Sequence, residues 1–164
     1  MVRELSRRFV WAHAHIFSEP PEEEEWIVKY KDKLIGNKPI LRIHDSGQWF
    51  EGGRLEGVQC ILFDVTVPRD DLGVEPSATV ALWENGVQTE GMRPIPVRYL
   101  QPVYPTQLGT TAAIFMGPLA GKQGIIRSID LDAEVYVVQI LEDQVLEDVR
   151  RESMTLCVPD NPPE

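Results

Sequence analysis

One segment constrains this chain more than any other. Residues 113–130, A-I-F-M-G-P-L-A-G-K-Q-G-I-I-R-S-I-D, read as two apolar strands joined by a loop punctuated with glycine. Glycine reaches positive φ without a Cβ clash, so Gly117, Gly121 and Gly124 favour a sharp turn. Pro118 fixes one φ and donates no hydrogen bond, which suits the same turn. The segment therefore predicts a β-hairpin with these residues in its turn.

The residues that follow predict further strands. Residues 125–129 alternate between two faces, and residues 134–141 are rich in strand formers after a turn at 132–133. Residues 153–158 can then close the sheet. Four or five short strands in about fifty residues are too few for a sandwich. They predict a small barrel, closed or nearly closed, which leaves few strand edges exposed.

The block from about residue 108 to residue 158 resembles the KOW module. That module is the small SH3-like barrel of NusG, of the large subunit of the elongation factor DSIF and of several ribosomal proteins. The resemblance is carried by the run G-P-x-A-G-x-x-G from Gly117 to Gly124, by the two β-branched residues after it and by the acid Asp130.

A second copy of the same theme lies upstream. Residues 52–64, G-G-R-L-E-G-V-Q-C-I-L-F-D, again place a glycine loop, ending at Gly57, before an apolar run and an acid. Residues 78–83 alternate as a strand, and Asn85-Gly86 is a strong two-residue hairpin turn. This copy lacks the Gly-Pro pair and carries a long loop at its centre, from Pro68 to Pro76.

The end of the first copy extends the resemblance. Residues 95–103 supply a closing strand, and V-R-Y-L-Q-P-V-Y-P-T at 97–106 is similar to the linker between the last two KOW modules of the DSIF large subunit. The predicted fold is all-β in the main, with two tandem SH3-like, KOW-type barrels. The expected divisions are an N-terminal arm or extra strand at 1–35, a first barrel at 36–105, a second at 106–158 and a loose tail at 159–164.

The charge of the chain bears on its partners. The formal net charge is −10 over 164 residues, and in residues 106–164 the acids outnumber the basic residues Lys122, Arg127, Arg150 and Arg151. Phosphate binding depends on lysine and arginine, so this balance argues against simple nucleic-acid binding. An acidic surface instead steers basic protein partners toward it. The charge therefore favours protein docking.

Compartment and cysteine chemistry follow from what the sequence lacks. No apolar run approaches membrane-spanning length, and the beginning of the sequence shows no signal-peptide pattern. The expected localisation is nuclear in a eukaryote and cytoplasmic otherwise. Cys60 and Cys157 each sit in an apolar strand and are expected to be buried free thiols. A disulfide between the barrels is the other possibility, disfavoured in a reducing compartment.

The sequence carries no pattern typical of an enzyme. It has no G-x-S-x-G and no phosphate loop before a helix. Paired carboxylates in polar, turn-like sequence are expected to stay solvated; these pairs are Asp70-Asp71, Glu142-Asp143 and Glu147-Asp148. His13 and His15 would share a strand face, but no third metal ligand is obvious. We expect no catalytic residues, metal, cofactor, membrane contact or small-molecule substrate.

Five residues are candidates for contact with a partner or nucleic acid. Lys122 and Gln123 lie at the turn, and Arg127 lies just beyond it on a strand. By resemblance this loop contacts RNA in some members of the family. Arg98 would extend a basic stripe, and Trp83 could grip a peptide or stack on a base. The competing interpretation is that the cations are isolated on the surface and the tryptophan packs in a core.

The resemblance implies a non-enzymatic docking adaptor of a transcription elongation factor. Its partners would be RNA polymerase or elongation-complex proteins, with weak RNA or DNA contact in addition. A Tudor-like reader of modified or basic peptide tails is the first alternative, and it requires an aromatic cage for cation–π binding. An RNA-binding ribosomal-type KOW module is the second, and it requires a basic stripe around Lys122, Arg127 and Arg98.

Overall fold

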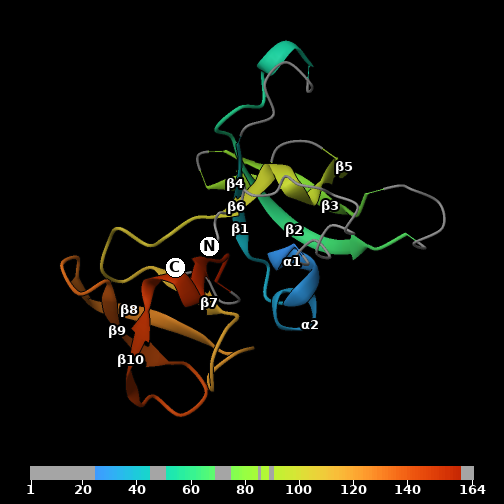
Figure 1. Ribbon diagram of the computed structural model, residues 1–164. Helices are drawn as coiled ribbons and strands as arrows, with labels where there is room; N and C mark the ends of the chain where they lie inside the picture. Colours follow the sequence, from blue (N-terminus) through green and yellow to red (C-terminus); the bar gives the residue numbers. More distant parts are fainter. Residues whose placement is uncertain (1–24, 45–50, 69–74, 85, 89–90, 160–164) are drawn as a thin grey trace, which may run out of the picture.

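The computed structural model describes residues 25–44, 51–68, 75–84, 86–88 and 91–159. In these residues the chain is mainly β, as predicted, with two antiparallel sheets and two short helices. Figure 1 shows the second sheet, in orange and red, below the first, with the helices in blue beside β1 and β2.

The first sheet has the strand order β4-β3-β2-β1-β6, and β5 also pairs with β3. Its strands are β1 (Ile40–Ile43), β2 (Gln59–Thr66), β3 (Ser77–Glu84), β4 (Val87–Gln88), β5 (Arg93–Pro96) and β6 (Leu100–Pro102). The second sheet has the order β10-β9-β8-β7-β11. Its strands are β7 (Thr111–Ile114), β8 (Gln123–Asp130), β9 (Val135–Ile140), β10 (Leu146–Arg150) and β11 (Met154–Leu156).

Neither sheet closes on itself in the described residues, so the closed form of the predicted barrel is not found. In the second sheet β10 pairs only with β9, and β11 pairs only with β7. The short 3-10 helix η4 (Arg151–Ser153) carries the chain from one edge strand to the other. Of these two edge strands, β11 has its Leu156 N–H bonded to the Val103 carbonyl, whereas β10 keeps backbone groups available for pairing.

The two sheets repeat one connectivity. The pairs β1·β2, β2·β3, β3·β5 and β1·β6 correspond in order to β7·β8, β8·β9, β9·β10 and β7·β11. The last two strands of each set are joined by a 3-10 helix, η3 (Val97–Tyr99) in the first and η4 in the second. A register shift occurs at the same place in both, between Leu62 and Asp64 in β2 and between Ile126 and Ser128 in β8.

The glycine turns repeat in their hydrogen bonds as well. The N–H of Gly57 donates to the Ile43 carbonyl over 2.7 Å, and the N–H of Gly121 donates to the Ile114 carbonyl over 2.8 Å. Gly57 has φ 82° and Gly121 has φ 94°, so a side chain is strained at both positions. Gly117 also has positive φ, at 86°. These residues form the turns that the sequence predicted.

Gly86 and Gly124 differ from each other. Gly86 has φ 77°, and Glu84 pairs with Val87 across the two-residue turn that contains it; its predicted partner Asn85 lies outside the described residues. Gly124 lies inside β8 and not in the turn, and its φ is not positive. A Cβ there would stand 2.3 Å from Cγ1 of Val138, so glycine is required by close approach of the neighbouring strand.

Each sheet has its own hydrophobic cluster, but the boundary does not follow the chain. The second cluster is Ala112, Ile114, Ile126, Tyr136, Val138, Ile140, Val149 and Met154. The first cluster holds the apolar face of the first sheet together with the helices, and it also includes Phe115, which directly follows β7. Phe115 packs against Trp26, with ring centroids 5.0 Å apart, and against Tyr30, at 5.5 Å.

The described part of the predicted N-terminal arm is helical. Helices α1 (Trp26–Lys29) and α2 (Lys31–Leu34) bury Ile27 and Leu34 in the first cluster. The indole N–H of Trp26 donates to the Leu100 carbonyl over 3.1 Å, which attaches α1 to β6. The rest of the predicted arm, with His13 and His15, lies outside the described residues.

A buried hydroxyl joins the two sheets. Thr155 in β11 is fully buried, and its Oγ1 donates to the Ile40 carbonyl over 2.7 Å and accepts from the Val103 N–H over 2.9 Å. The N–H of Leu156 adds a bond to the Val103 carbonyl at 2.8 Å, and Pro39 forms a bridge with Cys157. The sheets are therefore joined by side-chain and backbone hydrogen bonds.

We expect Thr155→Val to destabilise the protein by about 2–4 kcal/mol, because it leaves two buried backbone groups without their partner and each costs about 1–3 kcal/mol. Urea unfolding measures the change. Thr110→Val is the matched control, since its hydroxyl bonds to the Gln107 carbonyl in an exposed loop. Equal midpoints for the two variants would show that the Thr155 hydroxyl does not hold the sheets together.

Neither Cys60 nor Cys157 forms a disulfide in the described chain, and both are buried, as expected. Burial raises the pKa of the Cys60 thiol to about 12. The thiolate is the reactive form of cysteine, so Cys60 is inert at neutral pH.

Candidate functional site

Lys122 lies between the glycine turn and β8, and it is half-buried. Its ammonium group pairs with the Glu142 carboxylate on the turn after β9. The hydrogen bond to Glu142, followed by its charge, raises the pKa of Lys122. The charge predicted for nucleic-acid contact is therefore balanced by a carboxylate of the same sheet.

Gln123 is buried, in contrast to the exposed position predicted for it. Its side-chain amide donates to the backbone carbonyl of Asn37 over 3.2 Å and to the Asn37 side chain over 3.3 Å. The Asn37 amide in turn donates to the carbonyls of Lys33, at 2.8 Å, and Gly121, at 3.4 Å. Gln123 thus ties the glycine turn to the end of α2 and is not available to a partner.

Arg127 and Arg98 lie in different parts of the fold, Arg127 in the second sheet and Arg98 in the 3-10 helix between two strands of the first. Arg127 stands at the register shift of β8, exposed, and its Nε donates to the Gln139 side chain over 2.9 Å. Arg98 lies in η3, pairs with Glu75 at 3.2 Å and covers the Tyr99 ring at 4.7 Å. Because Lys122 and Arg98 each pair with a carboxylate, the predicted basic stripe carries little unbalanced positive charge.

Trp83 is half-buried in β3, opposite Gln88 of β4 and Gln59 of β2. The aromatic group formed by Trp26, Tyr30 and Phe115 packs within the first cluster, where Phe115 is only 3 % exposed. A Tudor-like reader needs rings that surround an open pocket. The rings of Trp26 and Tyr30 instead each pack against Phe115.

We expect Lys122→Glu to leave the fold intact and the affinity for single-stranded RNA unchanged within about twofold, because Glu142 already neutralises the ammonium group. A fluorescence anisotropy titration with labelled RNA measures the affinity, and an amide spectrum checks the fold. Arg127→Glu is the comparison, since the Arg127 guanidinium bonds to a neutral amide. A tenfold loss of RNA affinity with Lys122→Glu would show that this loop contributes to RNA binding.

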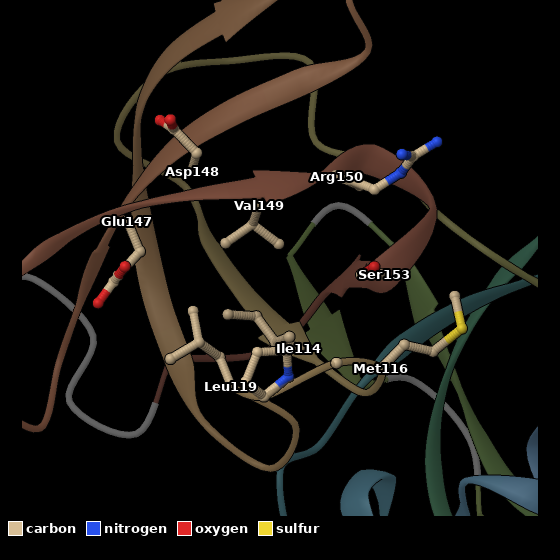
Figure 2. Close-up of a pocket in the computed structure, with 10 residues that line it drawn as sticks. Ile114, Met116, Leu119, Glu147, Asp148, Val149, Arg150 and Ser153 are labelled. Atoms are coloured by element: carbon tan, nitrogen blue, oxygen red, sulfur yellow. The ribbon is translucent and has the colours of Figure 1, made fainter.

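A groove lies where the two edges of the second sheet approach the glycine turn. It has a volume of about 370 Å³ and is lined by Ile114, Met116, Gly117, Pro118, Leu119, Ser153 and β10 from Glu147 to Arg150. Figure 2 shows Val149 directed from β10 toward Ile114 and Leu119, with Asp148 on the opposite side of the strand. The groove therefore has an apolar floor along the edge of β10.

The rim of the groove is acidic. Glu147 is half-buried and Asp148 exposed, and Arg150 pairs with Glu152 at 2.9 Å. The rim of the groove therefore has more carboxylate groups than guanidinium groups. The polar pattern around Glu147-Asp148 predicts a turn, whereas both residues lie in β10. The apolar alternation that would predict a strand is weak here, because Val149 is the only buried residue of β10.

Within the described residues, no group of three or more His, Cys, Asp and Glu side chains is placed to hold a metal ion. The pair Glu142-Asp143 lies in the turn after β9, and Asp70-Asp71 lies outside the described residues. No helix of the described chain is both long and apolar enough to cross a membrane. Comparison with known proteins finds no family model that matches the chain and no curated protein that matches it.

Proposed function

We propose that this chain is a non-enzymatic docking adaptor made of two tandem SH3-like modules of the KOW type, as in the large subunit of the elongation factor DSIF. Its partners would be RNA polymerase or proteins of the elongation complex, in the nucleus of a eukaryote or the cytoplasm otherwise. Contact with RNA or DNA would be weak, because the chain carries a net charge of −10.

The repeated architecture supports the KOW part of this proposal. Apart from β4, both sheets have the same strand pairing, the same register shift and a 3-10 helix before the last strand. Both also use a glycine with positive φ to return a hydrogen bond to the end of the first strand. A duplicated small β module is what a tandem KOW arrangement implies.

The groove beside β10 is the observation that carries the docking role. It combines an apolar floor of Ile114, Leu119 and Val149 with the carboxylates of Glu147 and Asp148 at its rim. Apolar contacts would supply affinity, while the acidic rim would select a partner segment with basic residues. A surface of this kind suits protein recognition better than phosphate recognition.

The proposal is tested by measuring binding of the purified chain to a reconstituted RNA polymerase elongation complex, to bare RNA and to histone peptides by biolayer interferometry. We expect micromolar or tighter binding to the elongation complex and at least tenfold weaker binding to the other two. Preference for a methylated histone peptide would support the Tudor-like alternative instead. Preference for bare RNA, with a steep salt dependence, would support the ribosomal-type alternative.

A further inference from the structure

The free edge of β10 exposes backbone groups that can be located from the hydrogen-bond pattern. In an antiparallel pair, successive residues alternate between bonding the neighbouring strand and pointing away from it. The N–H of Arg151 donates to the Glu134 carbonyl over 2.9 Å, next to the pair Arg150–Val135. Val149 therefore bonds to β9, while the backbone groups of Asp148 and Arg150 point away from the sheet. In the described chain neither of these two N–H groups donates to a backbone carbonyl outside the strand pairs.

The equivalent edge in the first sheet is blocked against pairing with a further strand. There the N–H of Val97 donates to the Pro76 carbonyl over 3.2 Å, so the outward positions of β5 are 94 and 96. Both are proline, and they occupy the positions in β5 that correspond to Asp148 and Arg150 in β10. Proline has no N–H, and proteins use it to prevent pairing at a strand edge. The chain therefore blocks this edge in one module and leaves it open in the other.

The apolar surface next to the edge shows the same difference. In the first sheet Ile43, Leu55 and Ile95 occupy the positions of Ile114, Leu119 and Val149, and all three are buried in one cluster with Ile27 of α1. In the second sheet Ile114 and Val149 are buried as well, and the difference lies at Leu119, which is only half-buried and lines the groove. An open edge and an adjacent apolar groove thus occur together in the second module.

We propose that β10 binds an extended segment of a partner protein, which adds to the second sheet as a further strand. Its alternate side chains would be apolar, facing Ile114, Leu119 and Val149 in the groove, and basic, facing Asp148 on the outer side. The site rests on the docking role proposed above, but it does not depend on the partner's belonging to the transcription machinery.

Charge selects this occupant over two others. Nucleic acid would bring phosphates beside Glu147, Asp148 and Glu152. A second copy of the chain carries the same net charge of −10, so pairing through this edge would bring two acidic surfaces together. A segment with lysine or arginine at alternate positions can form backbone hydrogen bonds with the edge of β10 and also pair with the carboxylates of the rim.

The probe for this site is a fluorescent peptide of about eight residues that alternates valine and lysine, titrated against the full chain by anisotropy. A matched peptide with glutamate in place of lysine is expected to bind at least tenfold more weakly. Asp148→Pro is expected to reduce affinity for the lysine peptide at least tenfold, because it removes one outward N–H as Pro94 does in β5. Asp148→Asn keeps that N–H and is expected to cost threefold or less. Equal affinities for Asp148→Pro and Asp148→Asn, with both variants folded, would overturn strand addition.

A second measurement leaves the protein unchanged. Two further lysine peptides carry backbone N-methyl groups, one on the valines and one on the lysines. Only one of these sets can face β10, so we expect one peptide to lose at least tenfold in affinity and the other to retain it. Equal binding of both peptides would overturn the proposal, even if Asp148→Pro failed to fold. Two further results would overturn it as well. One is that peptide binding shifts amide signals only outside β10 and residues 114–119, and the other is that the unliganded chain self-associates through β10.

The outcomes also separate this site from the proposed function. Binding of the elongation complex that survives Asp148→Pro would overturn the β10 site and leave the docking role standing. Peptide binding at β10 without any binding of the elongation complex would support the site and overturn the assignment to transcription.

Discussion

Gly124→Ala is expected to destabilise the second sheet by about 3 kcal/mol or more, because overpacking in a tightly packed site costs about 1–3 kcal/mol and backbone contact adds to it. The new Cβ would stand 2.3 Å from Cγ1 of Val138 and 2.8 Å from the carbonyl oxygen of Gln139. The valine methyl group can shift by a rotamer change, but the Gln139 carbonyl belongs to β9 and moves only if the β8–β9 pair separates.

Urea unfolding followed by amide exchange measures this effect and locates it. Gly91→Ala is the matched control, because Gly91 has no positive φ and a Cβ there would meet nothing within 4 Å. We expect faster exchange in β8 and β9 for Gly124→Ala and no change for Gly91→Ala. If both variants unfolded at the same urea concentration as the parent, the close approach at Gly124 would carry no energetic weight.

Phe115→Ala is expected to cost about 3–5 kcal/mol, the usual range for removing a buried phenylalanine. Phe115 is 3 % exposed and fills the first cluster against Trp26 and Tyr30, although it directly follows a strand of the second sheet. The loss should therefore appear in the first sheet and the helices. The variant would also loosen the link between the two sheets.

Amide exchange again distinguishes the possibilities. We expect faster exchange in β1, β6 and α1 and little change in β9 and β10. Leu108→Ala is the control, because Leu108 is 63 % exposed and truncation of such a side chain changes stability by about 0.5 kcal/mol or less. Faster exchange confined to the second sheet would show that Phe115 stabilises its neighbours in sequence and not the first cluster.

Much of the fold was readable in the sequence because its causes are local. The alternation in residues 78–83 predicted β3, and the strand-forming residues at 134–141 predicted β9. Glycine at 57, 117 and 121 predicted turns that need positive φ. The duplication was also visible, since residues 52–64 repeat the order of glycine loop, apolar run and acid found in residues 117–130. In each case a few adjacent residues carry the conformational requirement.

The candidate site was much less predictable. Gln123 looked like an exposed turn residue, but it is buried because Asn37, far away in sequence, supplies its hydrogen-bond partner. Gly124 looked like a turn residue, but its requirement comes from Val138 and Gln139 on the next strand. The groove depends on where β10 ends relative to the turn at residues 116–119, which no local pattern encodes.

By itself, then, the sequence determined the β class of the chain, its two glycine turns, its repeat and its acidity, because backbone preference, alternation and charge are properties of adjacent residues or of composition. Only the tertiary structure decided that Phe115 joins the first cluster, that Thr155 links the sheets, and that β10 keeps an open edge beside an apolar groove while Pro94 and Pro96 close the edge of β5. These features arise from contacts between distant segments, and their energy depends on which surfaces the whole chain brings together.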